Sequence, residues 1–164
     1  DVTDGTANTV AFSEHLVGPS IGTSARSMDY QNASLTFYDD ARMALVSGET
    51  PPGVKITTDL QNCLKSTTLS SGIGSRWNTG GIGYNFFNTV VTPNSTQFKF
   101  GGCKNGGGGA DGSAYTPATS NHSGGVNVLM CDGSVRFIKD SISYAVWWGL
   151  GTRAGGEAIS SDQY

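Results

Sequence analysis

The sequence has few charged residues. Lysine, arginine, aspartate and glutamate make up 14% of the 164 residues, against about 25% in an ordinary soluble domain. The formal net charge is −3 and no run of lysine or arginine occurs, so the chain lacks the basic surface by which proteins bind nucleic acid, and we expect no nucleic-acid partner. Apolar stretches also stay short of the ~18 residues that a membrane-spanning helix requires.

No signal peptide is recognisable, and the chain begins at Asp1 without a methionine. We therefore expect a processed or truncated product, the C-terminal part of a longer precursor whose upstream part holds the targeting signal. Glycine is abundant instead, with 24 residues, as are serine, threonine and asparagine. This composition is typical of exported and surface-assembled proteins and favours short strands, turns and long ordered loops. We expect residues 1–164 to form a single globular domain.

Only three cysteines occur, Cys63, Cys103 and Cys131, and their spacing argues against a zinc site. Cys103 lies in a Gly-rich loop where a thiol has little to pack against, so a covalent tether would give it a purpose. Cys131 ends an apolar run and is expected to be a buried strand residue. We therefore predict a Cys63–Cys103 disulfide, which closes a loop of about 40 residues and contributes roughly 3–4 kcal/mol. The alternative is three free thiols in a reducing cytosol.

Hydrophobic patterning predicts an α+β fold, mainly an antiparallel sheet with short helices and long Gly/Ser/Thr-rich loops. Helices are expected at 36–46, 55–65 and 143–150. The second of these would place Ile56, Leu60 and Cys63 on one face. Strands are expected at 9–17, 83–91, 126–131 and 134–139. The first would bury Val10, Phe12 and Leu16, and Asp132-Gly133 is a favoured two-residue hairpin turn between the last two.

Several of these segments resemble one known family. The run from His122 through Asp132-Gly133 to Phe137 is similar to the signature of prepilin-type proteins that carry a His-x9-Asp-Gly motif. The opening segment 4–12 resembles the family's Asp-Gly-Thr-Ser-Asn-Thr-Ile segment. Further similar pieces lie at 76–80, 87–94, 103 and 150–157, so the resemblance spans essentially the whole chain. The family has long been called a domain of unknown function, number 1559, and is expanded in planctomycetes.

The resemblance implies both a fold and a role. Full-length members resemble type IV pilins and type II secretion pseudopilins, with a short basic leader, a hydrophobic N-terminal helix that serves as membrane anchor and filament core, and a C-terminal globular part. It therefore implies a pilin-like globular domain, here without the N-terminal helix, that is cell-surface, extracellular or periplasmic. We expect a non-enzymatic structural or filament-assembly subunit that associates with itself or with other pilin-like envelope subunits.

The motif residues His122 and Asp132 also invite chemical interpretations. An imidazole oriented by a carboxylate can act as a general base, but no serine near His122 lies in a nucleophile-elbow pattern. A hydrolase that uses His122 is therefore the weaker alternative to a turn at Asp132-Gly133 and a loop steadied by His122. By analogy with pseudopilins that hold Ca²⁺, Asp4 and Asp132 are candidate calcium ligands. Asp4-Gly5 also suits a turn or a helix cap.

Aromatic residues form the remaining candidate site. A surface of rings beside polar side chains would suit carbohydrate binding, and its candidates are Trp77, Trp147, Trp148, Tyr84 and Tyr115, with core packing as the ordinary alternative. Neighbouring helix residues point about 100° apart, so Trp147 and Trp148 cannot both face fully inward and one should lie near a surface or an interface. This motivates our alternative function, a solute- or carbohydrate-binding module of the envelope with a polysaccharide partner.

Overall fold

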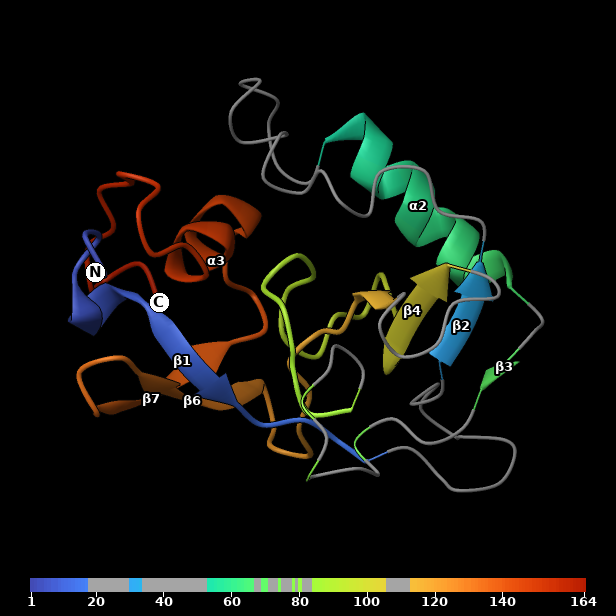
Figure 1. Cartoon of the computed structure of the whole chain (residues 1–164), viewed down its shortest axis with the longest axis horizontal. Coiled ribbons are helices and arrows are strands. Elements are labelled where there is room, and N and C mark those ends of the chain that lie inside the picture. The colour runs from blue at the N-terminus through green and yellow to red at the C-terminus, as the bar shows by residue number, and fades with distance from the viewer. Residues whose placement is uncertain are drawn as a thin grey trace.

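The described part of the chain contains two β-sheets, with one α-helix beside each (Figure 1). The computed structural model describes residues 1–17, 30–33, 53–66, 69–70, 74, 78, 80, 84–105 and 113–164. One sheet has the order β1-β6-β7, with bounds Val10–Ser13, Gly125–Met130 and Val135–Lys139. The other has the order β3-β2-β4-β5, with bounds Leu69–Ser70, Tyr30–Ala33, Gly102–Asn105 and Ser113–Tyr115. The helices are η1 Thr6–Asn8, α2 Val54–Lys65 and α3 Tyr144–Leu150.

The α+β prediction is confirmed, and the first sheet is antiparallel throughout. In the second sheet β2 runs parallel to β4, whereas the other two pairs are antiparallel. The helices predicted at 55–65 and 143–150 form as α2 and α3. The Ser143 hydroxyl accepts a hydrogen bond from the Val146 N–H and caps the start of α3. The helix predicted at 36–46 lies outside the described residues.

The β6–β7 hairpin is also confirmed, but its turn differs from the prediction. A two-residue type I′ turn needs positive φ at both central residues. Here Gly133 has φ 87°, whereas Asp132 does not have a positive φ. The Gly133 N–H donates to the Met130 carbonyl at 3.0 Å, and the Met130 N–H donates to the Ser134 carbonyl at 2.8 Å. This is the pattern of a three-residue loop, residues 131–133, in which the glycine takes the left-handed position.

A β-bulge in β1 overturns the prediction that Phe12 is buried. Val10 pairs with Met130, but Phe12 pairs with Leu129, so one extra residue lies in β1 between the two pairs. Paired residues point to the same side of a sheet, and Leu129 lies on the outer face of β6. Phe12 is consequently 69% exposed. Val10 still packs against the core.

Cys131 is exposed, which corrects the prediction of a buried strand residue. Side chains alternate along β6, and Val126, Val128 and Met130 all point inward. The strand ends at Met130. The next residue therefore falls on the outer side of the sheet, at the start of the hairpin turn.

The predicted disulfide is present and joins α2 to β4. The Cα atoms of Cys63 and Cys103 lie 5.9 Å apart, and both side chains are buried. Ile56 and Leu60 share the buried face of α2 with Cys63, as predicted. Cys103 lies in a strand rather than in a loop, because β4 pairs with both β2 and β5. The bond therefore ties a helix to the sheet on which it packs.

Both tryptophans of α3 are buried, contrary to the prediction. They do point apart, but α3 lies between two hydrophobic clusters. Trp147 packs with Val128 and Ile138 of the first sheet, whereas Trp148 packs with the cluster around α2 and the disulfide. Their exposed fractions are 0% and 4%.

The strand predicted at 83–91 does not form within residues 84–91. The backbone of this segment bonds elsewhere. The Val90 and Val91 carbonyls accept the indole N–H groups of Trp148 and Trp147, at 2.8 and 2.9 Å. The Asn88 N–H donates to the Thr116 carbonyl at 2.9 Å. Hydrogen bonds to α3 and to Thr116 thus take the place of the β-strand pairing that aromatic and β-branched residues favour.

Candidate functional site

The Asp4 carboxylate links the N-terminal segment to the C-terminal segment of the chain through hydrogen bonds. The carboxylate accepts hydrogen bonds from the Gly155 N–H at 2.7 Å and the Gly156 N–H at 2.9 Å, and the Thr152 hydroxyl lies 3.0 Å away. These bonds, led by that of Gly156, hold the pKa of Asp4 below its usual value. Gly5 rather than Asp4 occupies the N-cap position of η1. Asp4 is therefore not a helix cap, and its carboxylate is engaged by two backbone amides and one hydroxyl.

Asp132, the other predicted calcium ligand, is bonded within its own hairpin. One carboxylate oxygen accepts from the Ser134 N–H at 2.9 Å and from the Ser134 hydroxyl at 2.7 Å. The hydroxyl bond is the main reason that the pKa of Asp132 is lowered. In the parts of the chain that the structure describes, no three His, Cys, Asp or Glu side chains come together as a metal site.

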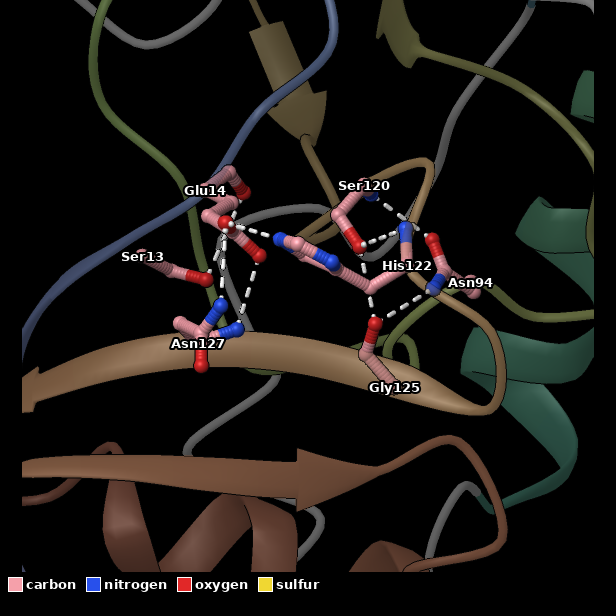
Figure 2. Close-up of polar contacts among 7 residues, drawn as sticks. All are labelled: Ser13, Glu14, Asn94, Ser120, His122, Gly125 and Asn127. Atoms are coloured by element: carbon pink, nitrogen blue, oxygen red, sulfur yellow. Dashed lines mark hydrogen bonds and ion pairs between the residues drawn. The ribbon is translucent and has the colours of Figure 1, made fainter.

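His122 bonds to Glu14 rather than to Asp132. Figure 2 shows its imidazole reaching from the turn before β6 toward Glu14, which follows β1, and the Nε2–Oε1 distance is 3.0 Å. Glu14 also accepts from the backbone and side-chain N–H groups of Asn127, at 2.8 and 3.2 Å. Burial acts to raise the pKa of Glu14, but these bonds and His122 outweigh it and lower that pKa. The pair links the turn to the first sheet, as predicted for a loop steadied by His122.

Sequence patterns did not reveal Glu14. Glu14 directly follows an apolar strand, and the chain has only 13 acidic residues. A carboxylate at such a position indicates that it has a bonding partner. The partner, however, lies 108 positions away in the chain. Because of this separation, no local sequence pattern predicts the pair.

A network around Asn94 shapes the same turn (Figure 2). Its side chain accepts from the Ser120 N–H at 2.8 Å and donates to the Gly125 carbonyl at 3.0 Å. The Ser120 hydroxyl donates to the same carbonyl at 2.8 Å and accepts from the His122 backbone N–H at 3.1 Å. Asn94 has a positive φ of 48°, which asparagine tolerates better than most residues. Among the described residues, no serine hydroxyl hydrogen-bonds the His122 ring, so the general-base interpretation lacks a nucleophile in contact.

A cleft of about 290 Å³ opens beside this network. Its lining comes mainly from the segments 94–100 and 117–124, and Asp140 also lines it. Leu16, Phe98, Phe100 and Pro117 supply its apolar lining. His122 and Lys99 also line it, together with the Asn94 and Ser120 side chains. The structure thus places one predicted site residue, His122, at a concave surface.

His15, next to Glu14, is largely shielded from solvent. Its Nδ1 lies 2.9 Å from the Pro117 carbonyl, which can only accept, so Nδ1 carries the proton. Burial lowers the pKa of His15, partly opposed by this hydrogen bond. The imidazole is therefore neutral at pH 7 and donates to the Pro117 carbonyl.

The aromatic residues do not form the predicted stacking surface. Trp147, Trp148 and Tyr115 are buried in the core. The Tyr115 hydroxyl donates to Asp59 at 3.0 Å, and burial together with that carboxylate raises the tyrosine pKa. Tyr84 is half-buried, and Trp77 lies outside the described residues.

The family model described as "protein of unknown function (DUF1559)" matches residues 1–144. The chain belongs to the DUF1559 family. No curated protein and no solved structure matches it. The predicted membership of the DUF1559 family is therefore confirmed, and the description of that family names no activity.

One further feature bears on where this DUF1559 domain resides. The Cys63–Cys103 disulfide is compatible with an oxidising, exported environment. Neither α2 nor α3, nor any other helix within the described ranges, has the length and apolar character needed to cross a membrane.

Proposed function

We propose that this DUF1559 domain is a non-enzymatic, pilin-like structural subunit of the cell surface or periplasm, which assembles with copies of itself or with similar envelope subunits. The supporting observation is an exposed apolar surface on the outer side of the first sheet. This apolar sheet face consists of Phe12, Leu129, Val135 and Phe137.

The strand register aligns the apolar sheet face. Phe12 pairs with Leu129, and Leu129 pairs with Val135, so the three side chains form a row across β1, β6 and β7. Phe12, Val135 and Phe137 are 69%, 66% and 45% exposed. Helix α3 packs on the opposite face of the sheet (Figure 1). Grouped apolar side chains on a soluble surface are typical of a contact with another protein.

A structural role also fits the bonding at the motif residues. His122 is paired with Glu14 at the edge of the sheet, and Asp132 closes its own turn. The Ser120 hydroxyl, the serine group bonded nearest to His122, is committed to backbone atoms. These bonds favour a motif that maintains the fold around the sheet over one that performs hydrolysis.

Self-association of the purified chain tests the proposal. We expect a concentration-dependent increase in sedimentation coefficient, and filaments or envelope-associated particles of native material in electron microscopy. A Phe12→Ser/Val135→Ser variant should remain monomeric with an unchanged melting temperature. Leu64→Ser is the matched control, because Leu64 is an exposed apolar residue on α2, outside this surface. A strictly monomeric parent protein with no envelope association would contradict the proposal.

A second candidate, a solute-binding module of the envelope, is favoured by the cleft beside His122. Its carbohydrate-binding form loses support because Trp147 and Trp148 are buried. Calorimetric titration with polysaccharides tests carbohydrate binding, and the absence of a binding heat would exclude it.

A further inference from the structure

The cleft beside His122 is concave but small. Its volume of about 290 Å³ is just below the roughly 300–1,000 Å³ typical of ligand pockets. A ligand of this cleft must therefore be small. Its apolar lining accepts an apolar group, and polar groups at the margin must orient the ligand.

Most polar groups of the wall are already engaged. The Asn94 amide bonds to Ser120 and Gly125. The Ser120 hydroxyl bonds to backbone atoms, and the Thr119 hydroxyl accepts from the Leu16 N–H at 2.9 Å. These bonds keep the wall in one conformation. Recognition therefore falls to the ionic side chains that the wall leaves unengaged.

Two side chains of opposite charge, Lys99 and Asp140, line the cleft without such bonds to the described residues. Lys99 is exposed between two buried phenylalanines, and it lines the cleft. Asp140 follows β7, and its backbone N–H donates to the Gly124 carbonyl at 2.9 Å. Neither Lys99 nor Asp140 forms a salt bridge with another residue in the described ranges, where the ion pair is that of His122 with Glu14. The cleft thus presents a cation and an anion that do not neutralise each other.

We infer that the cleft binds a free α-amino acid with an apolar side chain. The carboxylate of the ligand would contact Lys99, its ammonium would contact Asp140, and its side chain would enter the apolar lining. A zwitterion satisfies both charges at once, whereas a neutral sugar satisfies neither. The inference deepens the solute-binding candidate and is independent of assembly through the apolar sheet face.

Calorimetric titration of the 164-residue chain, with its disulfide formed, uses L-leucine as the probe. We expect saturable binding of leucine. Leucinamide, which lacks the carboxylate, and N-acetyl-leucine, which lacks the ammonium, should each bind roughly tenfold to a hundredfold more weakly, because each loses one charged hydrogen bond.

Variants assign each charge to its partner. Lys99→Gln should weaken leucine binding but change leucinamide binding little, and Asp140→Asn should do the same for N-acetyl-leucine. Lys139→Gln is the matched control, since Lys139 is exposed but does not line the cleft. Melting temperatures verify the folding of each variant, and the analogue series on the parent protein decides the question if a variant does not fold.

Two results would overturn the inference: no saturable binding of leucine, or equal binding of leucine and both analogues. If polysaccharide binds while leucine does not, the amino-acid assignment is wrong although the solute-binding candidate survives. If neither binds, both fail, and assembly through the sheet remains to be judged on sedimentation alone.

Discussion

Removal of the Cys63–Cys103 disulfide should lower the free energy of unfolding by about 4 kcal/mol. The two cysteines are 40 positions apart, and a closed loop of that length restricts the unfolded chain by this amount in the chain-entropy model. Both sulfurs are buried in the cluster that holds α2 against the second sheet. A Cys63→Ala/Cys103→Ala variant therefore also loses packing, which acts in the same direction.

Urea unfolding monitored by tryptophan fluorescence measures this loss. With a slope of about 2 kcal/mol per molar urea, the midpoint should fall by roughly 2 M. The control is Cys131→Ser, which should leave the midpoint unchanged because Cys131 is exposed and unbonded. If the double variant unfolds at the same urea concentration as the parent protein, or if peptide mapping without reductant places Cys131 in the bond, the reasoning is wrong.

Three other perturbations have defined outcomes. Trp148→Phe leaves the buried Val90 carbonyl without its donor, so urea unfolding should report a loss of about 1–3 kcal/mol; a loss near zero would mean that water replaces the indole. Asp4→Asn should remove the part of the stability that fades as pH falls below about 3.8, because the folded-state pKa of Asp4 is lowered; acid titrations that superimpose would contradict this. The pKa of His15 is also lowered, so the unfolded chain takes up that proton first and stability falls as pH drops below about 6.5. His15→Asn keeps an N–H for Pro117 and should flatten the melting-temperature curve there, and an unchanged curve would refute the assignment.

Features set by local patterning were predictable. The helical spacing of Ile56, Leu60 and Cys63 anticipated the buried face of α2. The Asp132-Gly133 pair marked the hairpin, because glycine readily takes the positive φ that such a turn requires. The disulfide followed from the poor packing expected of a thiol among glycines, and the structure confirms the pairing.

Features set by distant contacts were not predictable. The burial of both Trp147 and Trp148 depends on a second core on the far side of α3, which no helical periodicity encodes. The exposure of Phe12 follows from a one-residue bulge in the pairing of β1 with β6. In the candidate site, His122 was recognised, but Glu14 was not, because its contact with His122 joins residues 108 positions apart in the chain.

The position of α3 has a consequence for the cooperativity of folding. Two adjacent indoles on one seven-residue helix anchor two separate hydrophobic clusters, and both hydrogen-bond to the same short segment at Val90 and Val91. Loosening one sheet would displace the helix and strain the contacts of the other. The two halves should therefore melt in a single transition, despite having no strand in common.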